Sequence, residues 1–293
     1  MMTAKGIIAA LISRGYKTTQ LEIDAHLPGQ LLSLNVDAVF IASHGKFGED
    51  GTIQGLLDIM GLPYVGSGVM ASSIAINKIM SKKIFEFEGI RTPKWLAVNK
   101  RELISKVLIH IDEVFGKEQR LIVKPSSQGS TIGLTLVKEH HHLQEALEKA
   151  FQFDEDILVE EAIIGSELTV PVLGNDDVTA LPCVEIVSLN ELYDYEAKYA
   201  VNMSRHLIPP QVSIGVAQQA QDMAMKAHKA LGCQGISRSD FIADREGQCW
   251  LLEVNTLPGM TNTSLVPDSA KAFGYSYADL VEKLIELALQ KKG

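Results

Sequence analysis

The feature that most constrains this chain is a pair of alternating stretches, Ser237–Ile242 and Cys249–Asn255, separated by the turn sequence Asp244–Gly247. Alternation of polar and apolar residues around such a turn predicts a β-hairpin. Residues two apart on a strand share a face, so Leu252 and Val254 are expected to face a core. Glu253 and Asn255 are then expected together on the opposite face.

The register of the hairpin decides which polar side chains meet. If Asp244 pairs with Cys249, four polar residues share one face: Arg238, Asp240, Glu253 and Asn255. Two carboxylates and an amide oxygen are hard ligands that suit Mg²⁺ carrying phosphates. The alternative is a solvated hairpin face with ordinary alternation. Four such groups followed at once by a Pro-Gly pair favour the metal and phosphate site.

Composition limits the classes of protein that fit. The 293 residues suggest two or three domains, and 46% hydrophobic with 22% charged residues is typical of a soluble globular protein. The formal charge of −9 disfavours nucleic acid as a partner, and an acidic protein that binds ATP must gather its Lys and Arg locally. The three Cys are widely spaced, without a metal or CxxC pattern. With no membrane-length apolar run and no signal-peptide pattern, we expect a cytoplasmic enzyme.

The N-terminal part predicts a Rossmann-like domain with a parallel sheet. Helices are expected over residues 5–14 and 52–60, and strands over 18–23 and 36–42. Ligands in such sheets lie beyond the carboxyl ends of strands, which is where His44 falls. A structural or merely exposed histidine is an equally good interpretation of that residue.

A second informative stretch runs from Lys124 to Gly133, where a strand ends in Lys and a loop rich in Ser and Gly follows. Small residues let backbone N–H groups and hydroxyls, including that of Ser130, close on phosphate oxygens. The pattern is not GxxxxGK[ST], and a strand rather than a helix is predicted after it. We therefore expect a hairpin flap over phosphates, with a plain Ser/Gly turn as the alternative.

Other polar residues carry weaker signals. A single helix is predicted over residues 69–87, and Lys78 on it is by itself an ordinary solvated lysine. Three acidic residues lie near a strand crossover and are most simply interpreted as surface groups: Glu160, Glu161 and Glu167. A carboxylate at such a place can also bind the hydroxyls of a ribose. A solvated turn is favoured over a metal site for His140–His142. The Tyr- and Lys-bearing loop that includes residues 192–199 suits a substrate lid, and residues 259–267 are expected as a turn and a polar loop.

Five stretches together resemble the D-alanine–D-alanine ligase family of the ATP-grasp superfamily. They appear in family order over nearly the whole chain: His44–Gly55, Lys124–Gly133, Tyr193–Tyr199, Arg238–Asp240, and Glu253–Thr261 with Ser264-Leu265. The resemblance implies an α/β (α+β) ATP-grasp fold after the parallel-sheet domain. It implies three parts, namely residues 1–67, a central subdomain over 68–160 with the flap, and a C-terminal subdomain over 161–293 with the metal and substrate site.

The resemblance also implies the reaction and the roles of residues. ATP phosphorylates one D-alanine, and the amine of a second attacks the acyl phosphate, giving D-alanyl-D-alanine for peptidoglycan synthesis. Two Mg²⁺ ions, which Mn²⁺ can replace, would be held by Asp240, Glu253 and Asn255. ATP would be contacted by Lys78, Lys124, Ser130, Glu160, Glu161, Ile163, Glu167 and Lys198. Substrate and oxyanion contacts would come from His44, Tyr199, Arg238, Gly259, Ser264 and Leu265. A homodimer is implied as well.

One departure from the family concerns the first substrate. The family's first strand and its loop, with a Glu that helps hold the first D-alanine, have no counterpart here, and a misplaced start is the preferred explanation over a natural short variant. The alternatives kept open are a nucleotide-binding protein without full ligase activity and a ligase for another D-amino acid or D-hydroxy acid. Tyr199 in the expected lid resembles the ligases that form a dipeptide, which disfavours a ligase that uses a D-hydroxy acid.

Overall fold

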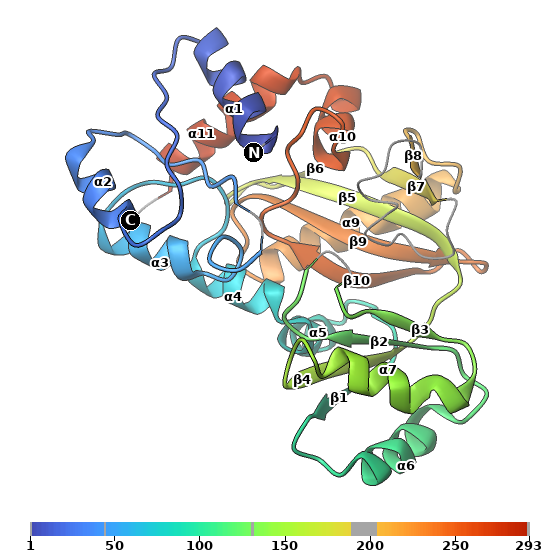
Figure 1. Ribbon diagram of the computed structural model, residues 1–293. Coiled ribbons are helices and arrows are strands. Elements are labelled where there is room, and N and C mark those ends of the chain that lie inside the picture. Colours follow the sequence, from blue (N-terminus) through green and yellow to red (C-terminus); the bar gives the residue numbers. More distant parts are fainter. Residues whose placement is uncertain (1, 44, 130–131, 189–203, 292–293) are drawn as a thin grey trace.

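The computed structural model describes residues 2–43, 45–129, 132–188 and 204–291 (Figure 1). Its named strands form two antiparallel sheets. The smaller sheet has the order β1-β4-β2-β3, and the larger has the order β10-β9-β5-β7-β8 with β6 beside β5. In Figure 1 the smaller sheet lies in the green lower part and the larger sheet across the middle.

The smaller sheet is built from β1 (Trp95–Asn99), β2 (Leu121–Pro125), β3 (Thr135–Val137) and β4 (Asp156–Glu161). Helices α6 (Ile104–Phe115) and α7 (Leu143–Ala150) contribute to the same core. Four buried residues of α7 recur at helical spacing and so form one apolar face: Leu143, Ala146, Leu147 and Ala150. That face packs with the buried residues of the strands, which fixes β2 and the Lys124 loop at its end.

The larger sheet contains six strands: β5 (Gly165–Gly174), β6 (Thr179–Ala180), β7 (Val184–Ser188), β8 (Ser204–Leu207), β9 (Gly235–Asp244) and β10 (Cys249–Asn255). Helix α9 (Ile214–Ala230) packs on it through Ala220, Ala224 and Ala227. Because these small side chains allow a close approach, the helix backbone lies near the buried residues of β5, β9 and β10. The polar face of the hairpin points the other way.

The remaining helices lie mostly in the N-terminal and C-terminal parts: α1 (Met2–Ser13), α2 (Leu27–Ser33), α3 (Thr52–Ile59), α4 (Val69–Ile76), α5 (Lys78–Phe87), α10 (Leu265–Phe273) and α11 (Tyr277–Leu289). Helices α1 and α11 lie side by side in Figure 1, and their apolar residues share one core with α10. None of the described helices is long and apolar enough to cross a membrane.

The predicted parallel sheet of the N-terminal part is wrong for the described residues. Residues 18–23 form no strand, and the 36–42 segment contributes a single parallel bridge, between Val39 and Tyr64. Two backbone hydrogen bonds support that bridge, from Val39 N to Pro63 O at 2.8 Å and from Val65 N to Val39 O at 2.9 Å. Two hydrogen bonds are enough for an isolated bridge, but a parallel sheet needs a longer ladder of evenly spaced bonds.

Two helix predictions also change. The single helix expected over residues 69–87 is interrupted at Asn77, whose ψ of 98° is not helical. The Asn77 side chain accepts a hydrogen bond from Met80 N and so caps a separate helix, α5, that begins at Lys78. The polar loop expected over residues 259–267 instead leads into α10, which begins at Leu265. Both new helix starts lie beside expected site residues.

Candidate active site

The polar face of the hairpin is present, with one correction to its register. Glu253 pairs with Asp240, and Asn255 pairs with Arg238, as predicted. Cys249, however, pairs with Ala243 rather than Asp244, because the register shifts between Leu251 and Glu253. This β-bulge adds one residue, Leu252, to β10.

The bulge also changes which residues face the core. Leu251 and Val254, three residues apart, are both buried, whereas Leu252 is only half-buried. The expectation that Leu252 faces the core is therefore wrong, and that for Val254 is confirmed. Strict alternation would have turned either Leu251 or Glu253 to the wrong side, so the bulge keeps both an apolar core and the acidic face.

Asp240 accepts three hydrogen bonds from two neighbouring side chains. The Arg238 guanidinium donates to both of its carboxylate oxygens, from Nε at 2.9 Å and from Nη2 at 2.7 Å. Thr169 on the neighbouring strand β5 donates its hydroxyl to Oδ1 at 2.6 Å. A carboxylate held from three donors keeps a fixed orientation, which is what a metal ligand or a transition-state contact requires. The sequence interpretation had not included Thr169.

Lys78 joins the hairpin to the loop that follows Lys124 between β2 and β3. At the start of α5 its Nζ donates to the Gln128 carbonyl at 2.7 Å and lies 3.4 Å from Oε2 of Glu253. Its backbone N donates to the Ser126 carbonyl at 2.9 Å, so both ends of the residue hold the loop. Only 8% of the Lys78 side chain is exposed, so its interpretation as an ordinary solvated lysine is wrong, while the ATP contact that the resemblance implied stays a prediction.

A second buried charge cluster lies beneath this loop. Glu160 on β4 accepts from Lys124 at the end of β2 through one carboxylate oxygen, and its other oxygen lies 2.8 Å from the ammonium of Lys82 on α5. Burial would raise the pKa of Glu160, but Lys124 and Lys82 outweigh it and hold that pKa below its usual value. Glu160 is almost fully buried, so its interpretation as a surface acid is wrong. Lys82 was not among the expected site residues.

Three further residues that were predicted to contact the nucleotide lie on or beside the connection from the smaller sheet to the larger sheet. Glu161 ends β4 and accepts from Gln119 Nε2 at 3.1 Å. Ile163 lies in the short connection that follows, and Glu167 lies on β5 opposite Ile186 and Ile242. Their proximity to a nucleotide stays a prediction.

Gly259 and the two expected second-substrate residues, Ser264 and Leu265, lie near the start of α10, whereas the other expected oxyanion residue, Arg238, lies on β9. Ser264 is the residue before the helix, and its hydroxyl accepts from Thr261 N at 3.1 Å. A Cβ added to Gly259 would lie 3.2 Å from the Ser264 hydroxyl, so the two turns are in close approach. Leu265 begins the helix and is buried. A helix N-terminus with backbone N–H groups and a nearby hydroxyl suits a substrate carboxylate.

Four predicted residues lie outside the described part of the chain: His44, Ser130, Lys198 and Tyr199. The strand–loop–strand arrangement around Ser130 is confirmed, because β2 and β3 pair antiparallel on either side of the loop. The expected substrate lid also lies largely outside the described residues.

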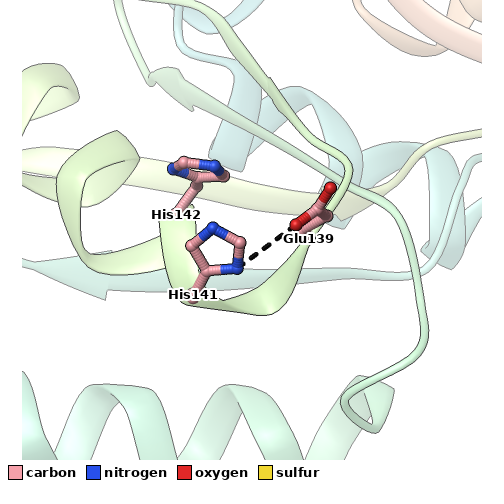
Figure 2. A group of neighbouring side chains, drawn as sticks. All are labelled: Glu139, His141 and His142. Carbon is pink, nitrogen blue, oxygen red and sulfur yellow. Dashed lines mark ion pairs between the residues drawn. The ribbon is translucent and has the colours of Figure 1, made fainter.

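The histidine triple forms an exposed 3-10 turn, η1 (His140–His142), between β3 and α7. His140 turns to Asp112, whereas the rings of His141 and His142 lie together with centroids 3.9 Å apart. Figure 2 shows both rings beside Glu139, whose carboxylate lies 3.4 Å from Nδ1 of His141. These three groups could approach one ion, but all are exposed, as the solvated-turn interpretation expected.

Comparisons with known proteins agree with this arrangement. The family model described as "D-ala D-ala ligase N-terminus" matches residues 9–67, and "D-ala D-ala ligase C-terminus" matches residues 84–286. A D-alanine–D-alanine ligase of Carboxydothermus hydrogenoformans is 46% identical over 99% of this chain and 93% of its own. A D-alanine–D-alanine ligase of Pelotomaculum thermopropionicum is 42% identical over 100% of this chain and 93% of its own.

Solved structures share the α+β fold. The D-alanine–D-alanine ligase of Bacillus anthracis complexed with ATP superposes with a TM-score of 0.83 at 30% identity, covering 99% of this chain and 91% of that one. The VanG D-Ala:D-Ser ligase of Enterococcus faecalis superposes with a TM-score of 0.79 at 34% identity, covering 87% of this chain and 74% of that one. This chain belongs to the D-alanine–D-alanine ligase family, within the ATP-grasp superfamily.

Proposed function

We propose that this chain uses ATP to join two D-alanines into D-alanyl-D-alanine, the dipeptide used in peptidoglycan synthesis. The observation that carries the proposal is the position of Lys78, whose ammonium contacts both the Gln128 carbonyl of the phosphate loop and the Glu253 carboxylate of the hairpin face. A group so placed can bind a phosphate whose charge is also neutralised by a cation held on the acidic face. The choice of D-alanine as the substrate rests on the relatives, which are D-alanine–D-alanine ligases.

The reaction requires charge neutralisation and oxyanion stabilisation from these residues. The γ-phosphoryl group of ATP passes to a carboxylate oxygen of the first D-alanine, which leaves ADP and an acyl phosphate, and Lys78 and Lys124 offset the charge that moves. The amine of the second D-alanine then attacks the acyl carbon. Arg238 and the Gly259 N–H stabilise the oxyanion of the tetrahedral intermediate, which breaks down by losing phosphate. The nitrogen gives up its extra proton to the departing phosphate, which leaves the neutral amide.

The second D-alanine must be aligned for this attack. Its carboxylate is held by the Ser264 hydroxyl and by the N-terminus of α10, where the peptide dipoles favour an anion. Fixing the carboxylate directs the amine at the acyl carbon and converts a bimolecular encounter into an oriented one. His44 contacts the first D-alanine, and the loop containing Lys198 and Tyr199 excludes water from the acyl phosphate.

The hairpin face fits Mg²⁺. Glu253 and Asp240 are directly opposed on neighbouring strands, so their carboxylates lie on one side of the sheet, with the amide of Asn255 one step along. Hard oxygen donors of this kind would hold Mg²⁺, or Mn²⁺ in its place, and the metal would supply charge neutralisation for the phosphates. Glu160, Glu161, Ile163 and Glu167 would hold the adenosine part. A cytoplasmic homodimer completes the proposal.

A second candidate differs only in the second substrate. The likeness to a D-Ala:D-Ser ligase, at 34% identity and a TM-score of 0.79, favours D-serine as the competing acceptor. Phosphate release from ATP, measured with D-alanine alone and with D-alanine plus D-serine or D-lactate, separates these possibilities when products are identified by mass. Release with D-alanine alone, yielding the dipeptide, supports the proposal. If the protein binds nucleotide but releases no phosphate in response to D-alanine, it is a nucleotide-binding protein and the proposed ligase function is refuted.

A further inference from the structure

The side chain that the proposed reaction leaves unexplained is Lys82. It lies one helical turn after Lys78 on α5, and none of its side-chain surface is exposed. Lysines are almost never fully buried unless their charge is paired, because removing an ammonium from water is costly. A buried lysine at this position therefore needs a reason beyond solubility or packing.

The contacts of Lys82 give that reason. Its Nζ lies 2.8 Å from Oε2 of Glu160, while Lys124 occupies the other oxygen of the same carboxylate. The Lys82 ammonium also donates to the Thr92 hydroxyl at 2.6 Å. Burial lowers the pKa of Lys82, and the carboxylate of Glu160 opposes that shift. One buried glutamate thus holds two ammonium groups from two different elements.

Thr92 connects this cluster to the larger sheet. Its hydroxyl donates to the Leu251 carbonyl at 2.7 Å, and the Leu251 N–H donates to the Arg91 carbonyl at 2.9 Å. Both backbone groups of Leu251 are therefore fixed by the segment after α5. The next residue along β10 is the bulge, and Glu253 follows it. In Figure 1, α5 lies at the junction of the two sheets.

We infer that Lys82 is a positioning residue, which holds Glu160 independently of Lys124 and, through Thr92, ties this pair to the strand that carries Glu253. The inference deepens the proposed function and rests on it for the reaction step, but not for nucleotide binding. Its physical basis is a partner exchange. When nucleotide phosphates draw Lys124 away, Glu160 keeps Lys82 as its counter-ion and remains ionised and oriented.

Without Lys82 this exchange is unfavourable. Glu160 would have Lys124 as its remaining ammonium partner in this cluster, and a phosphate could recruit Lys124 only by leaving a buried carboxylate uncompensated. Nucleotide affinity should then fall. A lysine that merely fills space and balances charge would instead affect the stability of the fold and leave nucleotide affinity unchanged, so the two roles predict different measurements.

The first experiment measures Mg-ADP binding to the full-length protein by calorimetry. Lys82→Met should weaken binding by about tenfold or more, a loss of at least about 1.4 kcal/mol. The matched control is Lys83→Met on the exposed neighbouring position of α5, which should bind like the wild type. Lys82→Arg keeps the charge and should recover part of the affinity. A folded Lys82→Met protein with wild-type affinity for Mg-ADP would overturn the inference.

The second experiment separates the link through Thr92. Thr92→Val keeps the shape and leaves the Lys82–Glu160 pair, so Mg-ADP affinity should stay within about twofold of wild type. Its kcat should fall by about tenfold, because small displacements of aligned groups reduce rate strongly. An unchanged kcat overturns the link through Thr92. If Lys82→Met does not fold, Lys82→Gln, which removes the charge but keeps a hydrogen-bond donor, replaces it in the Mg-ADP experiment with the same expected loss of affinity, and wild-type affinity would again overturn the inference. A wild-type protein that binds Mg-ADP but releases no phosphate with D-alanine would instead refute the proposed function.

Discussion

Replacing Glu253 by glutamine is the sharpest test of the acidic face. The change keeps the shape of the side chain and removes one negative charge from the face where Asp240 lies directly opposite. If Glu253 holds the metal that neutralises the phosphates, loss of the charge removes an interaction that is strongest in the transition state. Removing one such electrostatic contact costs about 10²–10³ in turnover, or roughly 3–4 kcal/mol.

The effect of the same change on folding should be small. The ion pair with Lys78 spans 3.4 Å, but 32% of the Glu253 side chain is exposed, so solvent screens it. Partly exposed pairs contribute about 1 kcal/mol or less, and Lys78 keeps its bond to the Gln128 carbonyl. The midpoint of thermal unfolding should therefore fall by no more than about 2–4 °C.

The assay combines phosphate release at saturating ATP, D-alanine and Mg²⁺ with thermal unfolding of the same samples. Glu246→Gln serves as the control, because Glu246 is an exposed acid at the turn of the same hairpin. That variant should match the wild type in both measurements. Turnover of Glu253→Gln within tenfold of wild type would refute the metal assignment, and a large loss of thermal stability would mean that the activity loss reports the fold instead.

Three other perturbations test the site and the fold. Arg238→Lys cannot reproduce the two-bond contact with Asp240, and kcat should fall by at least about tenfold; a rate near wild type would contradict the oxyanion role. Burial lowers the pKa of His228 from 6.5 to about 4, so stability to urea should fall by about 3 kcal/mol as pH drops from 6.5 to 4, and His228→Gln should remove this dependence. Gly165→Ala would drive a Cβ into a carbonyl of β9 at 1.8 Å and should cost about 1–3 kcal/mol in urea denaturation, whereas Gly29→Ala on an open helix face should not destabilise the protein.

The hairpin shows how far alternation alone can predict a site. The pairs of Asp240 with Glu253 and of Arg238 with Asn255 follow from the sequence and are present. The pairing nearer the turn is wrong by one residue, because period-two counting assumes an uninterrupted ladder. A signal for the bulge was available in the sequence, since apolar residues at both 251 and 252 leave no way to alternate up to Glu253.

The N-terminal part was less predictable because its apolar segments are short and their partners are distant in sequence. An apolar run such as residues 36–42 meets the requirements of a buried strand, yet whether it joins a sheet depends on neighbours that the run itself does not encode. Here a single bridge to Tyr64 forms. The break at Asn77 was readable in principle, because Asn is a strong helix N-cap, but continuous helical periodicity on both sides concealed it.

The charges of the site explain how an acidic chain can bind a polyanion. The sequence indicated that the cations had to be gathered locally, and the structure gives each of them a carboxylate partner: Lys78 with Glu253, Lys124 and Lys82 with Glu160, and Arg238 with Asp240. Pairing allows these ammonium and guanidinium groups to be buried before a nucleotide arrives. In the proposed site, phosphates compete with carboxylates for the same donors, so we expect the affinity for nucleotide to be set by the difference between two sets of ion pairs. Substitutions that remove one member of a pair should consequently change nucleotide affinity even where that member never touches the nucleotide.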